Sequence, residues 1–341
     1  MAKILAISDP QYHNYKANSV MVDGVNSRCR HVDMTMEAAM KLAKTMKPAI
    51  ITITGDIFEE HGRIRPSVFN MVHHRLTEMS KVCPVILSIG NHDMEDSTLG
   101  ASSIDTFDAI PGVYVMGGTA GYSMLEIRDM RILGVQYFHK TEDFKRAFEA
   151  GLAEYPNPDV VMMHQGIDDF NGTGMPDTKL TCEYIKSKTD AWVLCGHYHF
   201  PNRNGKIINV GAPLQHTFGD EGSERGCWTI DTDGGAKFYP LNVTPKFKTI
   251  RDKGDIKDVA GCFVRIIAKT LRSANALQKA AEDAGALFSK AVIDKEYTTA
   301  HAATVKATSD PKMMIGDFCK LVPRLEPHTD KIVAMWERVC L

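Results

Sequence analysis

Five short apolar segments of the chain have the pattern of buried β-strands. Their hydrophobic residues are continuous rather than alternating and are rich in isoleucine and valine, which is typical of strands covered on both faces. Apolar residues at helical spacing lie between the first three segments, in Val32–Met46, which ends before Pro48, and in Ser67–Lys81. The predicted strands are Lys3–Ser8, Ala49–Thr54, Val85–Ile89, Val160–Met163 and Ala191–Cys195.

The middle of the chain has the pattern of β-hairpins. Short alternating runs there are separated by turn sequences such as Asp129-Met130 and Gly234-Gly235. Strand–helix units followed by such β-rich segments predict a layered α/β sandwich with a mixed sheet. The alternating runs are Tyr114–Met116, Tyr122–Ile127, Arg131–Val135, Lys206–Val210, Gly226–Asp231 and Ala236–Leu241.

The pattern changes after residue 243. Val243–Asp258 is polar and irregular, and we interpret it as a linker. A strand, a helix and a second strand follow and predict a small βαβ unit: Cys262–Ala268, Leu271–Ala284 and Ala286–Ile293. Asp310 and Pro311 favour the start of one further helix, and Thr329 that of a last one. We therefore expect a large domain over residues 1–243, a small domain over 244–300 and a helical segment over 301–341.

The composition is that of an ordinary globular protein, with 341 residues of which 44% are hydrophobic and 24% charged. The net charge of −2 gives no overall attraction for nucleic acid, so DNA binding would depend on a local basic patch or a partner. No apolar run approaches the roughly 20 residues that span a bilayer, and the N-terminus does not resemble a signal peptide. The eight cysteines form no C-x-x-C pair. We expect a cytoplasmic protein without a membrane partner or a structural zinc site.

Residues with metal-binding side chains follow each of the five predicted strands. The carboxyl ends of strands in an open α/β sheet meet at one edge, so these residues can converge on one site. Taken alone, a strand-end aspartate is usually a turn or cap residue, and a buried histidine is usually just hydrogen-bonded. Five such positions in order indicate a metal site, because Asp, Asn and His supply ligands that suit manganese, iron or zinc. The positions are Asp9, Gly55-Asp56, Gly90-Asn91-His92-Asp93, His164 and Gly196-His197-Tyr198-His199.

This ordered set resembles the signature of the calcineurin-like metallophosphoesterases, over about the first two thirds of the chain. The resemblance implies a four-layer αββα sandwich. It also implies two divalent ions, manganese by family expectation, with magnesium, iron and zinc as alternatives. Two ions about 3.5–4 Å apart would clamp the attacking and leaving oxygens of a phosphoester and would supply hydroxide near neutral pH.

The same resemblance assigns a role to each matching residue. Asp56 would bridge the two ions. His92 would face the phosphate as the catalytic residue that stabilises charge or protonates the leaving oxygen, and Asp93 would orient His92. The remaining ligands would be Asp9 and His199 at the first ion, and Asn91, His164 and His197 at the second.

One position departs from the family signature, which usually reads D-x-H where this chain has Asp9-Pro10-Gln11. The amide oxygen of Gln11 can bind a metal, but it is a weaker ligand than imidazole. If the segment is extended, Asp9, Gln11 and His13 share one side, so His13 is an alternative ligand. A third alternative is that Gln11 only hydrogen-bonds. Our hypothesis is that the first ion is the labile one.

Two further segments resemble the SbcD-type nucleases and their phage recombination counterparts. The first runs from Gly55-Asp56-Ile57-Phe58 to Arg65-Pro66-Ser67, with Glu59 where that family often has histidine. The second is Asn209–His216, followed by Phe218-Gly219-Asp220-Glu221 and Arg225-Gly226. The resemblance implies a DNA nuclease, exonuclease or endonuclease, that acts in recombination or repair and carries a capping domain. If the chain is phage-encoded, it would act in the host cytoplasm.

In that family the nuclease subunit is a homodimer and works with an SMC-like ATPase, so the resemblance implies both partners. The apolar stripe Ile332, Met335, Trp336 and Val339 suits a helix that docks on the ATPase, and equally one that packs on the protein's own small domain. Basic residues of two loops beside the strand ends could contact DNA phosphates, although such sparse charges are more often plain surface. They are Arg28, Arg30 and His31 in one loop and His61, Arg63 and Arg65 in the other.

Two other functions stay open. The same centre could serve a phosphomonoesterase or a cyclic-nucleotide phosphodiesterase, whose site would be closed and small. A degenerate metallophosphoesterase could act as a scaffold without activity, which Gln11 makes conceivable. A P-loop nucleotide-binding protein is disfavoured because the chain has no G-x-x-x-x-G-K-[ST] segment.

Overall fold

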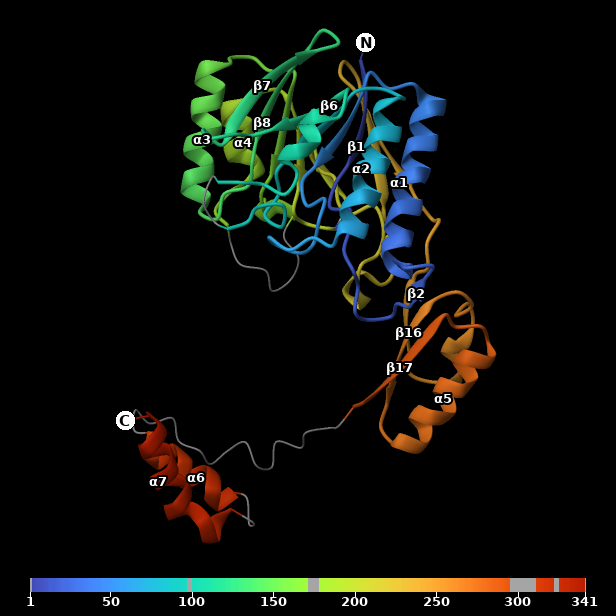
Figure 1. The fold of residues 1–341 in the computed structure, drawn as a ribbon, viewed down its shortest axis with the longest axis vertical. Helices are drawn as coiled ribbons and strands as arrows, with labels where there is room; N and C mark the ends of the chain where they lie inside the picture. Colours follow the sequence, from blue (N-terminus) through green and yellow to red (C-terminus); the bar gives the residue numbers. More distant parts are fainter. Residues whose placement is uncertain (1, 97–99, 171–177, 295–310, 322–324, 341) are drawn as a thin grey trace.

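The computed structural model describes residues 2–96, 100–170, 178–294, 311–321 and 325–340. Two six-stranded sheets pack face to face, and helices cover both outer faces (Figure 1). The predicted four-layer αββα sandwich is therefore confirmed. In spatial order the first sheet contains β14 (Ala236–Pro240), β13 (Gly226–Asp231), β1 (Lys3–Ile7), β4 (Ile50–Thr54), β5 (Val85–Ser88) and β6 (Val113–Met116). The second contains β11 (Asn202–Asn204), β12 (Ile207–Asn209), β10 (Trp192–Gly196), β9 (Val160–His164), β8 (Met130–Val135) and β7 (Tyr122–Ile127).

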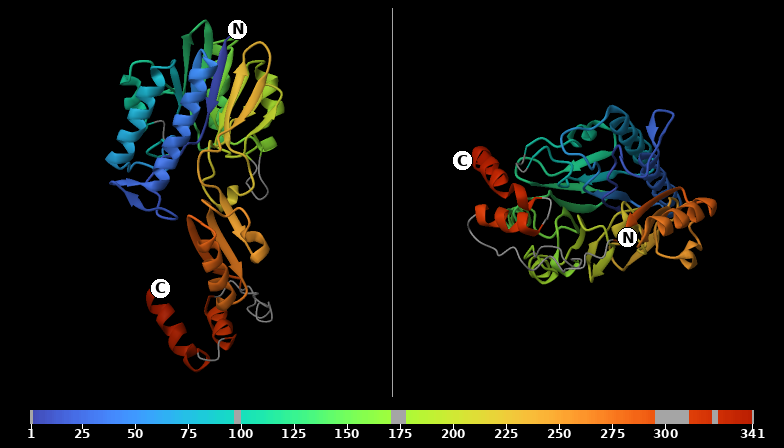
Figure 2. Two further views of the ribbon diagram at one scale, coloured as in Figure 1. Left: turned by 90° about the vertical axis from the view of Figure 1, so that its right-hand side faces the viewer. Right: turned by 90° about the horizontal axis from the view of Figure 1, so that it is seen from below.

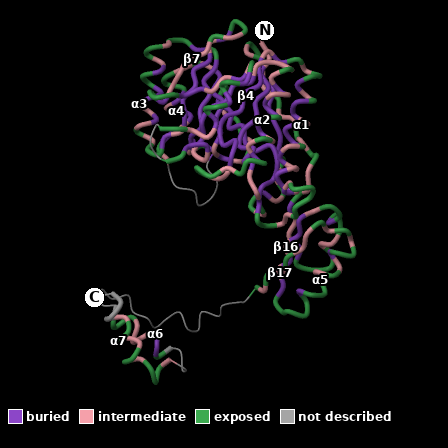
Figure 3. Tube along the Cα trace, viewed as in Figure 1, coloured by how far each residue is buried: buried purple, intermediate pink, exposed green. Residues whose placement is uncertain are grey.

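Successive side chains of the central strands point to opposite faces of the sheet and pack into two different hydrophobic cores. In β1, Leu5 packs beneath α1 (Ser27–Met46) and α2 (Pro66–Ser80), whereas Ile4 faces the second sheet. Because both faces of each sheet are covered, the strands are continuous apolar runs in the sequence. The buried residues are concentrated in these inner layers (Figure 3).

The second sheet has its own helical cover, α3 (Thr141–Glu154) and α4 (Cys182–Lys188). Phe144 and Phe148 of α3 are fully buried against it. Neither helix is among the elements that the sequence pattern predicts.

Helix α1 begins at Ser27, five residues before the predicted start at Val32. Its true N-cap is Asn26, whose side-chain oxygen accepts hydrogen bonds from the backbone N–H groups of Arg28 at 3.0 Å and Cys29 at 3.2 Å. The first turn is mostly polar, so hydrophobic spacing alone could not reveal it. This turn places Arg28 near the carboxyl ends of the strands.

All five predicted ligand-bearing strands are present, each within one residue of its predicted bounds. Strands β1, β4, β5 and β6 pair in parallel, as do β8, β9, β10 and β12. The carboxyl ends of β1, β4, β5, β9 and β10 therefore meet at one edge of the sandwich.

A small domain follows the sandwich. Its sheet has the order β15 (Phe247–Ile250), β16 (Phe263–Ala268) and β17 (Phe288–Ile293), all parallel, and α5 (Leu271–Asp283) packs on it. The predicted βαβ unit thus carries one strand more. The interpretation of Val243–Asp258 as an irregular linker was wrong, because Phe247 and Ile250 of this segment are buried as strand residues.

The C-terminal helices α6 (Pro311–Leu321) and α7 (Thr329–Cys340) pack against each other and lie apart from the two sheets of the sandwich (Figures 1 and 2). Both predicted starts, Pro311 and Thr329, are observed, whereas Asp310 lies outside the described residues. Within the described ranges, no helix is long and apolar enough to cross a membrane.

Candidate metal centre

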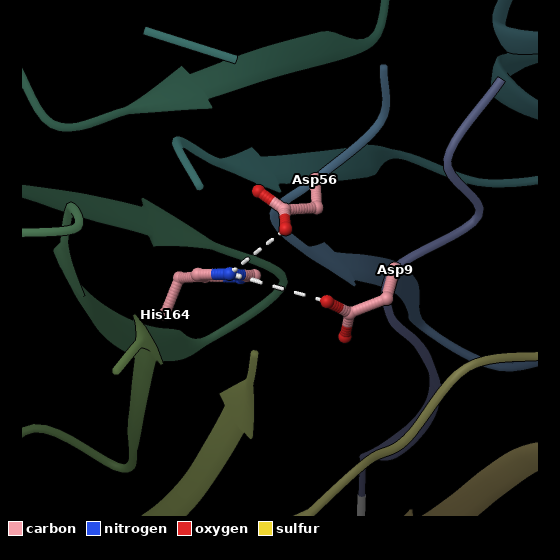
Figure 4. Close-up of side chains that lie close together, drawn as sticks. All are labelled: Asp9, Asp56 and His164. Carbon is pink, nitrogen blue, oxygen red and sulfur yellow. Dashed lines mark ion pairs between the residues drawn. The ribbon is translucent and has the colours of Figure 1, made fainter. Parts of the chain in front are cut away.

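Three buried side chains from three strand ends form the heart of the site. Asp9 follows β1, Asp56 follows β4 and His164 ends β9, and their ligand atoms lie within 4.8 Å of one another (Figure 4). The Nε2 atom of His164 is 3.4 Å from Oδ2 of Asp56 and 3.9 Å from Oδ1 of Asp9. These atoms are close enough to bind a common ion.

Asn91 extends the cluster toward β10. Its Oδ1 atom lies 3.1 Å from Nε2 of His164 and 3.1 Å from Nδ1 of His197. An amide oxygen and two imidazole nitrogens thus converge on one point. This is the set that the sequence predicted for the second ion, together with Asp56.

The ligand side chains can approach one another this closely because two neighbouring positions, Gly55 and Gly90, are glycines. A Cβ on Gly55 would lie 2.3 Å from Nδ1 of His164, and one on Gly90 would lie 2.2 Å from Oδ1 of Asp56. Asp9 and Asp56 adopt the left-handed region, with φ of 49° and 50°. Few non-glycine residues do so, and the conformation aims both carboxylates inward at some cost in strain.

The charge balance of the centre favours cations. Asp9 and Asp56 are 0% and 2% exposed. In the described part of the chain neither carboxylate forms an ion pair with a lysine or arginine, and the side chains within ion-pair distance of them are His92 and His164. Buried carboxylates are costly unless a cation compensates them. Oxygen and nitrogen ligands in this arrangement fit two divalent cations.

The protonation states follow from this crowding. Burial lowers the pKa of His164, but Asp56 and Asp9 outweigh burial and raise that pKa to about 10. Burial raises the pKa of Asp56, yet His164 brings it to about 2. Burial and the neighbouring His164 lower the pKa of His197 to about 4, so its ring is neutral. His197 is therefore ready to bind a metal, whereas His164 must first lose a proton.

His92 lies at the mouth of the centre. Its backbone N–H donates to Oδ1 of Asp56 at 2.9 Å, and its Nδ1 lies 2.7 Å from the carbonyl oxygen of Glu59. Its side chain is 26% exposed, and Nε2 is 3.9 Å from Oδ2 of Asp56. The ring is therefore held by Glu59 and presents its second nitrogen at the site.

The predicted role of Asp93 needs correction. Its carboxylate accepts the N–H groups of Phe58 and Gly90, each at 3.1 Å, and does not contact the His92 ring. Burial raises the pKa of Asp93 to about 7. Asp93 thus shapes the turn, and the Glu59 carbonyl orients His92.

The segment after Asp9 is not extended, so the assumption behind His13 as a ligand was wrong. Asp9 and Gln11, with φ of 49° and 50°, turn the chain, and the Gln11 N–H donates to the Asp56 carbonyl at 3.0 Å. Nδ1 of His13 lies 3.2 Å from the Gln11 carbonyl oxygen, and its ring packs on Tyr15 at 3.5 Å.

His216 is a residue of the site to which the sequence pattern assigned no role. It is 4% exposed, its Nε2 lies 3.1 Å from the Asp9 carbonyl oxygen, and its Nδ1 lies 3.1 Å from the Tyr15 hydroxyl. Its ring centroid is 5.3 Å from that of His199. His216 therefore contacts both Asp9 and His199. The one feature of the sequence that points to His216 is that it ends the second segment resembling the nucleases, Asn209–His216.

A cavity of about 680 Å³ opens over the centre. Its wall includes the predicted ligands Gln11, Asp56, Asn91, His197 and His199, together with His92. Gln11 and His199 thus line the same cavity as Asp56 and Asn91 of the cluster. The wall continues past Glu59, Glu60, His13 and Tyr15 to Lys16, Arg28 and His216.

The six residues proposed to contact DNA are dispersed. Arg28 lines the cavity, and the His61 ring stacks on His92 at 4.7 Å. Arg30 pairs with Asp23 at 3.5 Å, and the His31 ring lies 6.1 Å from that of Phe263 in the small domain. Arg63 and Arg65 are exposed and do not line the cavity.

Comparison with known proteins agrees with this geometry. A sequence model of the calcineurin-like phosphoesterases matches residues 2–201. The chain belongs to this family. A protein of Invertebrate iridescent virus 6, provisionally named phosphoesterase 244L, is 24% identical over an alignment 266 residues long. The alignment covers 74% of this chain and 86% of the viral protein.

Solved structures with a similar fold include a dimetal phosphatase from Danio rerio, with 10% identity and a TM-score of 0.40. The match covers 67% of this chain and 91% of that protein. A hypothetical protein from Thermus thermophilus has 14% identity and a TM-score of 0.43, with 70% of this chain and 99% of that protein covered. Scores this low support no argument about substrate.

Proposed function

We propose that this phosphoesterase is a metal-dependent nuclease that hydrolyses phosphodiester bonds of DNA, as the nuclease subunit of a recombination or repair complex. The observation that carries the proposal is the form of the cavity. It does not end at the ligand cluster but continues to Lys16 and Arg28. A site for a small monoester has no need of this extension, whereas a polymer with repeated phosphates does.

The residues of the chain divide the work by position. Asp56 would hold both ions, with Asp9, Gln11 and His199 on one side and Asn91, His164 and His197 on the other. Bound divalent ions would neutralise the phosphate oxygens and activate water, and manganese is our first expectation. Nε2 of His92, oriented by the Glu59 carbonyl, would donate a proton to the leaving oxygen.

The proposal includes two protein partners, a second copy of the chain and an SMC-like ATPase. Support for the ATPase comes from α6 and α7, where Met313, Phe318 and Met335 are 60%, 53% and 59% exposed. Apolar side chains exposed on a helix pair are suited to a helical partner. Of the predicted stripe, Ile332 and Trp336 are half-buried, and the side chain of Val339 lies outside the described residues.

Truncation after residue 310 should abolish co-purification with a coiled-coil ATPase, and undiminished co-purification would refute the anchor.

The activity test compares substrates in manganese. End-labelled duplex and single-stranded DNA are offered beside p-nitrophenyl phosphate and a cyclic nucleotide, with Asp56→Asn as the inactive control. We expect DNA to be cleaved with the highest kcat/KM and Asp56→Asn to lose at least about 100-fold. Turnover of the monoester or cyclic nucleotide alone would favour those alternatives. Absence of turnover with all substrates would favour the scaffold.

A further inference from the structure

The three buried arginines of the sandwich differ in their partners. Arg75 and Arg225 are 8% and 3% exposed, and each donates to a carboxylate at 2.7 Å, that of Asp33 and of Asp220 respectively. Arg28 is 7% exposed, yet it forms no ion pair with a carboxylate of the described residues. Buried charges are normally paired. The described carboxylate that acts on the charge of Arg28 is that of Asp220, but it is bonded to Arg225. The guanidinium of Arg28 therefore keeps charge to offer to a bound anion.

Arg28 is held rigidly at the cavity wall. Its guanidinium stacks on the Tyr15 ring at 3.9 Å, and Nη2 donates to the His216 carbonyl oxygen at 2.6 Å. Phe247 and Phe263 of the small domain lie behind it, with ring centroids at 5.3 and 5.5 Å. A guanidinium has five N–H donors, so this arrangement leaves donors for a ligand in the cavity.

The guanidinium lies close to the metal centre. One residue links them, since His216 accepts from Arg28 through its carbonyl oxygen and contacts the Asp9 carbonyl oxygen through its ring. Lys16 lines the same cavity and is exposed. Glu59 and Glu60 also line it, but among the described residues neither forms an ion pair with Arg28 or Lys16, and the main electrostatic neighbours of Glu59 are His92 and Asp56. The positive charge is therefore available to an anion bound beside the ions.

We propose that Arg28 and Lys16 form a subsite for the phosphate next to the scissile phosphodiester. The inference rests on the proposed nuclease function and defines its substrate class, a polynucleotide with at least two neighbouring phosphates. Arg28 is the specific contact because its planar donors match phosphate oxygens, and Lys16 adds a point charge at the rim.

The test compares thymidylyl-thymidine, whose only phosphate is the scissile one, with its 5′-phosphorylated and 3′-phosphorylated forms. In manganese, we expect kcat/KM for one phosphorylated form to exceed that for the parent dinucleotide by about ten- to a hundredfold, the range of a charge-assisted contact. Arg28→Gln should lower this ratio at least about fivefold, chiefly through KM. Lys16→Gln should lower it in the same direction.

Arg146→Gln is the matched control, since Arg146 lies on α3 with a 78% exposed side chain and does not line the cavity. It should leave the ratio unchanged. If Arg28→Gln does not fold, Lys16→Gln decides, because this position is exposed. A second readout needs no turnover. Binding of single-stranded oligothymidylate in EDTA weakens as the salt concentration rises. In Arg28→Gln the plot of log binding constant against log salt concentration should be shallower by about 0.7, which corresponds to the loss of one phosphate contact.

The outcomes separate the two proposals. Equal turnover of all three dinucleotides by the parent protein, or an unchanged ratio in both variants, would overturn the subsite and leave the nuclease proposal intact. Hydrolysis of bis(p-nitrophenyl) phosphate without hydrolysis of any dinucleotide or of the end-labelled DNA would overturn the nuclease proposal and this substrate class with it.

Discussion

At the scale of single residues, steric room decides how closely the ligands of this centre can approach. Asp56 and His164 reach each other because Gly55 and Gly90 leave space that a methyl group would occupy. Gly55 directly precedes Asp56, and Gly90 directly precedes Asn91 and lies against Asp56. The positions of the metal ligands therefore depend on the absence of a side chain at these two glycines.

Replacement of Gly90 by alanine should therefore disable the centre. The new Cβ would lie 2.2 Å from Oδ1 of Asp56, and both Asp56 and the 91–93 turn would have to shift. We expect at least about a 100-fold loss in kcat/KM for bis(p-nitrophenyl) phosphate and weaker manganese binding by calorimetry. Gly234→Ala is the control, because its Cβ would meet nothing within 4 Å. Activity of Gly90→Ala within twofold of the parent would contradict the geometry.

A second residue-scale prediction concerns pH. Burial, with repulsion from His199, holds the pKa of His216 well below its ordinary value of 6.5. The unfolded chain then binds a proton that the folded chain does not, so stability should fall as pH drops below 6.5, by about 1.4 kcal/mol per unit.

Urea unfolding in EDTA at pH 7.5 and 5.5 measures this effect. The difference between the two pH values should be smaller in His216→Gln than in the parent, although the variant is less stable overall. His74→Gln, at an exposed position on α2, controls for the loss of a histidine. An identical pH difference in His216→Gln and the parent would show that the ring is not held neutral.

The identity of the strand-end residues could be predicted from sequence, because each follows an apolar run. Their hydrogen-bond partners could not. Asp93 follows His92 directly, yet its side chain bonds to Phe58, which is distant in sequence. His216 reaches Asp9 from 207 residues away. Such contacts depend on tertiary packing that no local pattern encodes.

At the scale of elements, the N-terminal turn of α1 joins fold to site. Asn26 caps the helix and so fixes Arg28 beside the cavity. Asn26→Ala removes this cap and the hydrogen bonds that the Asn26 amide donates to Tyr15 and Ser19, so it should cost at least about 1 kcal/mol of unfolding free energy. Urea denaturation would measure the loss. Asn70→Ala, an exposed position inside α2, should be neutral or slightly stabilising, because alanine is the better helix former. Equal effects of the two changes would argue against the cap.

Sequence patterns predicted some elements better than others. Strands buried on both faces were found because their apolar runs are unbroken. Strand β15 lies in the segment interpreted as a linker because it has only four residues, of which two are buried, and so leaves no long apolar run. The predicted start of α1 was late because its first turn carries a capping signal rather than a hydrophobic one. Local composition therefore predicts buried elements and misses those defined by capping or by pairing.

At the scale of the whole molecule, the small domain is attached beside the cavity. Oε1 of Glu221 accepts the Thr249 N–H at 2.6 Å, and its Oε2 accepts the Thr249 hydroxyl at 2.5 Å. Arg265 also donates to that hydroxyl at 2.8 Å, and its guanidinium lies 4.8 Å from the Phe218 ring centroid. The sandwich and the small domain are thus joined by polar and aromatic contacts.

Loss of Glu221 should loosen this attachment. Glu221→Ala leaves the Thr249 N–H and the Thr249 O–H without their acceptor, although Arg265 still donates to the hydroxyl oxygen. The loss should cost about 1–3 kcal/mol. Hydrogen exchange in β15 should accelerate while that in β1 is unaffected. Glu224→Ala, an exposed neighbour in the same loop, should change neither. Unchanged exchange in β15 of Glu221→Ala would show that the polar contacts do not hold the domain.

The central claim is that residues from five strand ends bind two cations around Asp56. Anomalous diffraction from crystals grown with manganese tests it most directly. We predict two peaks flanking Asp56, one beside Asp9 and His199 and the other among Asn91, His164 and His197. A map without peaks at Asp56, or with Asn91 and His197 turned away from the ion, would contradict the account.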